Sequence, residues 1–400
     1  MYKLNRRHFL AGLSFLTGNI AFSSESPKND KSVIFIWLGG GISQIEFINP
    51  LPLAPIEIRS VNGHLNNNVC QIGGTFQNLN KIANDITFVR SLHHRDANHE
   101  TATNWMITSE ANFRADASNW PSYGSLLVHL NGFTNNDMPT YVKMNKIDGD
   151  GPAWLGTGCT GYATDAQGIS DLTPKSDSNT FRRRLEMVNS IDKTKGYLPD
   201  DWIQLREKSV DMIYGNTHIA LDLKNEKEEE INKYNAGKSQ FGKDCLTAKR
   251  LIKFGSQFVN INFGGWDMHN GIMDGFNSRG PELDYILSTL ISDLKNELPN
   301  TLIVVASEFS RTFKINQNAG RDHMASTNSV LLAGGGYSHG KLIGDTTADG
   351  SQVSSDELSP KDLSWTIFNH LGYNKDILLY DQQKRPHRMF DQQAQDIITL

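Results

Sequence analysis

The sequence predicts an α/β protein with a mainly parallel central sheet and helices on both of its faces. Continuous apolar runs at 33–38 and 301–306 are too short for core helices and suit strands that are covered on both sides. A third strand pattern lies at 257–263, and apolar residues recur at helical spacing at 241–252 and 283–294. This alternation is typical of parallel strands joined by crossover helices.

The other elements continue the alternation along the chain. Strands are expected at 86–89, 140–142 and 329–333. Helices are expected at 76–83, from about 99, around 126–128, over most of 181–214, at 224–233 and at 360–371. Residues 148–168 are rich in Gly, Thr and Asp and suit a loop at the rim. We expect one domain over residues 32–400.

Residues 1–23 have the pattern of an export signal. The basic residues Lys3, Arg6 and Arg7 precede an apolar segment at 9–22 that is too short to span a bilayer comfortably as an ordinary helix. The paired arginines followed by His-Phe-Leu resemble the twin-arginine signal, and small residues allow cleavage after Ser23. We therefore expect passage through the twin-arginine translocase to the periplasm or cell exterior, a linker at 24–31 and no stable membrane span after cleavage. An uncleaved N-terminal anchor is the alternative.

Overall composition excludes two classes of protein. The chain has 400 residues and a formal net charge of -5, so it lacks the basic excess of a nucleic-acid-binding protein. Its three cysteines, Cys70, Cys159 and Cys245, can form at most one internal disulfide, which excludes a disulfide scaffold. Cys245 lies at helical spacing among apolar residues and is expected to be a core residue.

Polar side chains gather where predicted strands end. The four strand ends and the loop after the last carry Ser43 and Glu46, His99 and Thr101, Asp267 and His269, Glu308 and Arg311, and finally Asp322 and His323. Carboxyl ends of parallel strands share one edge of a sheet, where open α/β sheets place their ligand sites. Carboxylates and imidazoles without a thiolate favour zinc, manganese or another divalent ion, as one ion or two. The alternative for each residue is an ordinary polar group in a loop.

Particular roles follow from position. Asp267 and His269 are two residues apart, so on an extended segment both can reach one ion. Arg311 could hold the oxygens of a tetrahedral anion as a bidentate donor. Asn98 is a suitable N-cap for a helix from about His99, whose first turn would face a bound anion. Thr101 in that turn and Ser43 are both candidate nucleophiles.

Five motifs in order resemble a known family. They are Phe241-Gly242-x-x-Cys245-Leu246-x-Ala248-Lys249-Arg250-Leu251, Gly264-Gly265-Trp266-Asp267-x-His269, Ser307-Glu308-Phe309-x-Arg311-Thr312, Gly320-Arg321-Asp322-His323 and Leu331-Leu332-Ala333-Gly334-Gly335-Gly336. This order is similar to that of the exported bacterial family catalogued as domain of unknown function 1501, which is placed among alkaline-phosphatase-like and sulfatase-like proteins. The resemblance implies an alkaline-phosphatase-like three-layer sandwich.

The resemblance also implies site roles. Asp267, His269 and His323 would form one metal site, and Glu308 would reach toward a second, shared with the acidic residue after the first strand. The family usually has two aspartates there, whereas this chain has Glu46 and Asn49, so the second site would be weaker or empty.

Two functions are compatible with this pattern. The first is an exported, metal-dependent hydrolase of phosphate or sulfate esters, acting on a small anionic ester or a sulfated or phosphorylated glycan. The second is a non-catalytic cell-envelope binding protein that retains the fold and at most one metal. No nucleotide fingerprint or cysteine cluster supports a redox protein.

Overall fold

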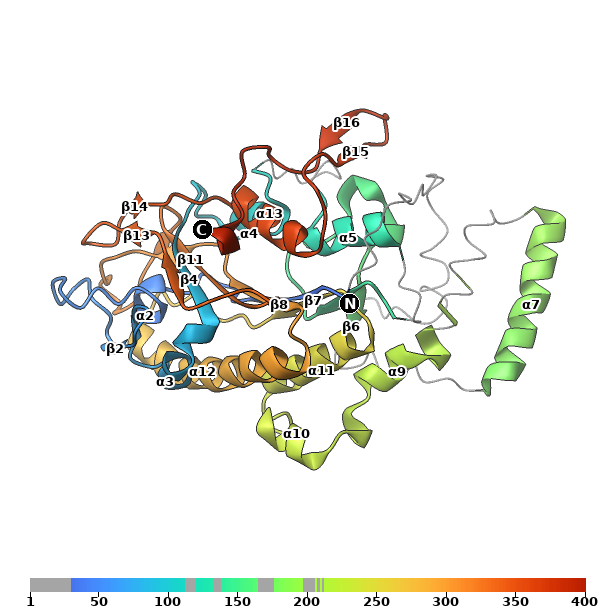
Figure 1. The fold of residues 1–400 in the computed structure, drawn as a ribbon, viewed down its shortest axis with the longest axis horizontal. Coiled ribbons are helices and arrows are strands. Elements are labelled where there is room, and N and C mark those ends of the chain that lie inside the picture. The colour runs from blue at the N-terminus through green and yellow to red at the C-terminus, as the bar shows by residue number, and fades with distance from the viewer. Residues whose placement is uncertain are drawn as a thin grey trace.

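An eight-stranded sheet forms the centre of the computed structural model, which describes residues 30–111, 120–132, 138–164, 176–196, 206, 209–210 and 212–400 (Figure 1). In order across the sheet the strands are β12 (Lys341–Ile343), β4 (Ile86–Leu92), β11 (Asn328–Gly334), β8 (Thr301–Ala306), β1 (Ser32–Trp37), β7 (Phe258–Asn262), β5 (Tyr141–Met144) and β6 (Tyr162–Thr164). The predicted strands are all present, and β6 is an additional edge strand inside the expected rim loop.

The sheet is mainly parallel, as predicted. Only β11 runs antiparallel to its neighbours, β4 and β8, whereas the other adjacent pairs are parallel. The chain passes from β8 to β11 without an intervening helix, so it returns in the opposite direction instead of crossing over. As a result β1, β4, β7 and β8 all end at the same edge of the sheet.

Helices cover both faces of the sheet (Figure 1). One face carries α3 (Gln77–Lys81), α11 (Gln240–Phe254) and α12 (Ile272–Glu297), and the other carries α4 (His99–Thr108), α5 (Tyr123–Asn131) and α13 (Pro360–His370). Because side chains alternate along a strand, β1 sends Ile34 and Ile36 into the first core and Val33, Phe35 and Trp37 into the second. Cys245 lies fully buried in the first core, as expected.

Helix α12 extends further than the apolar spacing predicts. Its first half contains Gly275, Gly280 and Pro281, which break the amphipathic pattern. A Cβ atom at Gly275 would lie 2.5 Å from the Met268 sulfur, and one at Gly280 would lie 2.5 Å from a Thr75 methyl group. The small residues therefore allow close packing that a count of apolar positions does not register.

Smaller elements complete the fold. The other helices are α2 (Gln44–Phe47), α7 (Ser178–Lys195), α9 (Asn216–Leu221) and α10 (Glu228–Lys233), with 3-10 turns η1 (Ala83–Asp85), η2 (Ala153–Leu155), η3 (Thr157–Cys159), η4 (Leu223–Asn225) and η5 (Ile397–Thr399). Two-stranded ribbons pair β2 (His64–Asn66) with β3 (Gln71–Gly73), β9 (Ser310–Arg311) with β10 (His323–Met324), β13 (Asp345–Thr346) with β14 (Val353–Ser355), and β15 (Leu378–Tyr380) with β16 (Pro386–Arg388).

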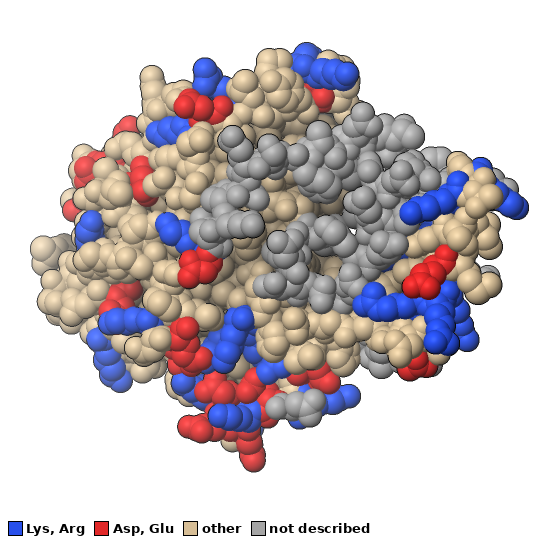
Figure 2. Space-filling model, turned by 45° about the vertical axis from the view of Figure 1, so that its right-hand side comes forward, with Lys and Arg blue, Asp and Glu red and all other residues tan. Residues whose placement is uncertain are grey.

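A network of charges fastens α10 to the body of the protein. The Lys249 ammonium, on α11, lies 2.9 Å from carboxylate oxygens of both Glu230 and Asp293 and 2.8 Å from one of Glu297. Its side chain is 6% exposed, so these contacts lie largely out of water. Charged side chains of both signs gather in this region, at the lower edge of the face in Figure 2.

Four expectations fall partly or wholly outside the described residues. The export signal at 1–23 and residues 24–29 of the expected linker lie outside them. So do residues 165–168 of the expected rim loop and parts of the helix expected over 181–214, of which α7 is described. Within the described residues, no helix has both the length and the apolar character needed to cross a membrane.

Candidate metal centre

Glycines after β1 bring the backbone of three strand ends together. Gly40 has φ +107°, and a Cβ there would lie 2.6 Å from the Asp267 amide nitrogen, so only glycine lets this loop pack against the segment after β7. The Gly40 N–H donates to Glu308 Oε1 at 2.7 Å. The loop therefore fixes Glu308, at the end of β8, next to Asp267.

His99 enters the same space from the first residue of α4. As predicted, Asn98 caps this helix, its side-chain oxygen accepting from the N–H groups of Glu100 and Thr101. The His99 Nδ1 atom lies 2.8 Å from Glu308 Oε1, and because a carboxylate accepts, Nδ1 carries the proton. This hydrogen bond raises the pKa of His99. His99 Nε2 is buried and has no hydrogen-bond partner among the described residues.

Two further histidines are oriented in the same manner. His269 Nδ1 donates to Asp322 Oδ1 at 2.8 Å, a bond that lowers the pKa of Asp322. His323 Nδ1 donates to the backbone oxygen of Ala97 at 2.9 Å. In their neutral forms each ring then has its lone pair on Nε2. Metal-ligating histidines are held in this way, with the other ring nitrogen bonded to a carboxylate or carbonyl.

The three Nε2 atoms converge on Asp267. His269 Nε2 and His323 Nε2 are 2.9 Å apart, and they lie 3.1 and 3.3 Å from Asp267 Oδ1. His99 Nε2 lies 3.5 Å from Asp267 Oδ2. Tetrahedral zinc with bonds of about 2.0–2.1 Å spaces its ligand atoms about 3.3 Å apart. The ligand atoms of His99, Asp267 and His323 all lie within 4.8 Å of one another, so these three residues fit one divalent ion, and His269 Nε2 lies beside two of them.

Asp267 is held as an anion. Burial on its own raises the pKa of Asp267, but the hydrogen bond and charge of Arg311 outweigh this effect, and the pKa falls to about 2. The Arg311 Nη2 atom donates to Asp267 Oδ1 at 2.5 Å. The side chains of Asp267, His269, His99 and His323 remain 48%, 38%, 37% and 25% exposed, so the centre is open to solvent. Catalytic zinc sites use three protein ligands and leave a fourth position for water or substrate, and His99, Asp267 and His323 make such a set of three.

Arg311 does not face the solvent. Its guanidinium is fully buried and, besides the bond to Asp267, donates to the backbone oxygens of Gly40, Gly41 and Arg321. In this arrangement it positions Asp267 and the glycine loop, and it does not present a free pair of donors to an anion.

Two other candidate residues lie apart from the histidines. The Glu46 side chain is fully buried and 2.9 Å from Arg321 Nη2, and Ser43 Oγ donates to the Glu46 carboxylate. Nothing in the sequence marks Arg321 as a fully buried arginine or as the partner of Glu46. Thr101 is partly exposed, with Oγ1 3.4 Å from Asn98 Oδ1, in the turn that follows His99.

Glu308 and Asp322 occupy an outer position. Each accepts from a histidine Nδ1, so they orient ligands, whereas His99 supplies a nitrogen to the centre. The spacing of residues cannot distinguish a ligand from the carboxylate that holds it.

Fold and site together define an α/β protein with a candidate centre for a divalent ion at the carboxyl edge of its sheet. Residues 30–399 match the model of the family described as "Protein of unknown function (DUF1501)", and the chain belongs to that family. A comparison with curated proteins finds no match to this sequence.

Several solved structures align along most of the chain. Ps i-CgsB in complex with k-i-k-neocarrahexaose is 11% identical, with 93% of this chain and 76% of that chain covered and a TM-score of 0.45. The lipoteichoic acid synthase LtaP from Listeria monocytogenes is 11% identical, with 95% and 79% covered and a TM-score of 0.44. The alkaline phosphatase from the Antarctic bacterium TAB5 is 12% identical, with 86% and 99% covered and a TM-score of 0.38. Because these structures are at most 11–12% identical to this chain, they do not identify its reaction, which depends on the residues of the candidate centre.

Proposed function

We propose that this protein is an exported, metal-dependent hydrolase of phosphate or sulfate esters, with a small anionic ester or a sulfated or phosphorylated glycan as substrate. One observation carries the proposal: three imidazoles, each with Nδ1 bonded to an oxygen, turn Nε2 toward the Asp267 carboxylate. The exposure of these side chains supports a catalytic role, because a substrate can reach them. Export rests on the twin-arginine pattern at Arg6 and Arg7.

The donor set favours zinc, with manganese as the alternative, because imidazole nitrogens outnumber carboxylate oxygens. A divalent ion supplies Lewis-acid polarisation of the ester oxygen and lowers the pKa of water. The protein's part is to hold the ion: Asp267 stays ionised through Arg311, while Glu308, Asp322 and the Ala97 carbonyl fix which histidine nitrogen bears a lone pair.

The nucleophile has two candidates from this chain and water as the third. Ser43 is 1% exposed and its hydroxyl is bonded to Glu46, so it is poorly placed to attack a substrate. Thr101 is partly exposed and follows His99 in the same helical turn, which makes it the better protein nucleophile. We favour water, since the Thr101 hydroxyl has no adjacent base among the described contacts.

A second function has one specific observation in its favour. In the interior, Ser43 and Arg321 both donate hydrogen bonds to Glu46, so the carboxylate after the first strand is not free for a second ion. A protein with one metal and no catalysis, binding a polysaccharide or a partner in the cell envelope, is compatible with that arrangement.

One experiment separates the two functions. The purified protein, loaded with zinc or manganese, is tested on aryl phosphates and aryl sulfates beside Asp267→Asn and His323→Gln, with the exposed His64→Gln as matched control. The hydrolase requires turnover that Asp267→Asn and His323→Gln abolish and that His64→Gln leaves intact. Tight metal binding without turnover on any ester would support the binding protein. Absence of metal binding would exclude the hydrolase and would leave the binding protein, which holds at most one metal, as the remaining function.

A further inference from the structure

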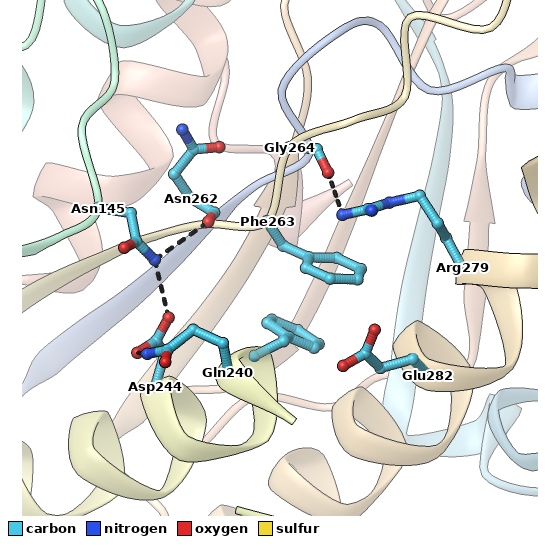
Figure 3. Close-up of a pocket in the computed structure, with 9 residues that line it drawn as sticks. Asn145, Gln240, Asp244, Asn262, Phe263, Gly264, Arg279 and Glu282 are labelled. Atoms are coloured by element: carbon cyan, nitrogen blue, oxygen red, sulfur yellow. Dashed lines mark hydrogen bonds between the residues drawn. The ribbon is translucent and has the colours of Figure 1, made fainter. Parts of the chain in front are cut away.

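A cavity of about 300 Å³ lies beside the metal centre, between α11, α12 and the ends of β5 and β7 (Figure 3). Gly264 lines it, and Asp267 follows three residues later, so the cavity and the centre share one edge of the sheet but no residue. Its volume is at the lower end of the range for small-molecule pockets and exceeds what a single inorganic ion needs.

A buried carboxylate without a cationic hydrogen-bond partner forms one side of the cavity. Asp244, on α11, is 5% exposed and accepts from the amides of Gln240 at 2.7 Å and Asn145 at 2.8 Å. Burial raises the pKa of Asp244 to about 6, although the two hydrogen bonds and the charge of Lys243 lower it. Neutral amides satisfy the carboxylate's geometry, and the charge of Lys243 compensates its negative charge only in part, since the pKa stays raised.

A second carboxylate lies on the other side. Figure 3 shows Glu282, on α12, on the opposite side of the two aromatic rings from Asp244. Glu282 accepts a hydrogen bond from Ser239 Oγ at 2.5 Å. The cation of the lining, Arg279, donates to the Gly264 backbone oxygen, and its guanidinium carbon lies 4.7 Å from the Phe263 centroid. Two carboxylates and one guanidinium give the lining a formal charge of -1.

The geometry points to a second binding site in this cavity, for a small organic cation bearing an ammonium group. The amide donors of Gln240 and Asn145 are bonded to Asp244, and Asn262 Oδ1 is a buried acceptor without a hydrogen-bond partner among the described residues. Arg279 Nε is an unpartnered donor in the lining, but the two carboxylates and this amide oxygen favour a ligand that donates.

An ammonium group offers three donors and no acceptor. The stacked rings of Phe241 and Phe263, 4.2 Å apart, supply an apolar surface for the carbon part of the ligand. The inference goes beyond the proposed hydrolase and needs no metal.

The test uses propylammonium and its neutral counterpart 1-propanol, titrated by calorimetry and NMR into the full-length protein with and without zinc. Propylammonium is expected to bind at millimolar concentrations and 1-propanol is not. Asp244→Asn and Glu282→Gln should each weaken binding at least about tenfold, or about 1.4 kcal/mol. Glu229→Gln, an exposed glutamate on α10, is the matched control and should change nothing.

Each outcome bears on the site. The binding site is supported if both variants lose propylammonium binding and Glu282→Gln unfolds at the wild-type temperature. This holds even if Asp244→Asn is less stable than wild type. Equal binding of propylammonium and 1-propanol overturns the cationic requirement. No binding of propylammonium, or binding that survives both substitutions, overturns the site. Since ester turnover is not the readout, failure here leaves the proposed hydrolase untouched.

Discussion

Glu308→Gln is the substitution that tests most sharply how the metal centre is held. Glutamine keeps the shape of the side chain and an oxygen to accept the Gly40 N–H, now at 2.7 Å, so the fold should persist. It removes the negative charge that faces His99 Nδ1 at 2.8 Å. Loss of such an orienting carboxylate costs about 10- to 100-fold in metal affinity. The Glu308 side chain is 3% exposed, so water does not screen the charge and we expect the upper end, about 2.8 kcal/mol.

Asp322→Asn provides the matched comparison. It makes the same change to the partner of His269, but this carboxylate is 56% exposed. Solvent screening should limit the loss to about tenfold, or about 1.4 kcal/mol. Zinc affinity of both variants is measured by competition with a chromogenic chelator, with urea unfolding of the metal-free proteins to verify the fold. Wild-type affinity in Glu308→Gln, or a larger loss in Asp322→Asn, would refute the orienting role of Glu308.

Three other predictions follow from the described contacts. Glu46→Gln leaves the buried Arg321 guanidinium without its carboxylate, so the free energy of unfolding measured in urea should fall by about 3–5 kcal/mol while zinc affinity stays unchanged. A loss of zinc affinity without a loss of stability would show instead that Glu46 is a metal ligand. His370 is fully buried, and burial lowers its pKa from 6.5 to about 4. Because the unfolded state therefore binds the proton first, the free energy of unfolding should fall by about 3 kcal/mol as pH drops from about 6.5 to 4. His370→Gln should remove this pH dependence, and an unchanged slope in the variant would contradict the argument. Chelator should abolish ester hydrolysis and lower the thermal unfolding temperature of wild type but not that of Asp267→Asn; equal shifts in the two would place the ion elsewhere.

The fold was predictable because its signals are local. Buried parallel strands are short apolar runs, and the helices between them carry their core positions at regular spacing, so β1, β8 and α11 follow from the sequence directly. The exceptions have physical causes. β6 pairs at the edge of the sheet without an apolar run, and the first half of α12 packs through glycines that carry no hydrophobic signal.

The site was predictable as a set of residues but not as a set of roles. Asp267, His269, His323, Glu308 and His99 do lie together, because the strands that deliver them end at one edge. Hydrogen bonds decide which nitrogen of each histidine faces the centre, and an example is the bond from His323 to the Ala97 backbone carbonyl. Every residue has such a carbonyl, so the sequence cannot show that this one orients His323.

The first strand shows the same limit. Glu46 follows a strand end, as a ligand would, yet its charge is taken up by Arg321, which is 275 positions further along the chain. A pairing over that distance depends on how loops pack and cannot be read from spacing.

The central claim is that one divalent ion binds at His99, His323 and Asp267, with His269 beside them. Crystals grown with zinc, with data collected on both sides of the zinc absorption edge, test it most directly. A single anomalous peak is expected about 2.0–2.2 Å from the Nε2 atoms of His99 and His323 and from an Asp267 oxygen. Two peaks, or one peak bonded to Glu308 or Asp322 with the His99 Nε2 left out, would contradict it.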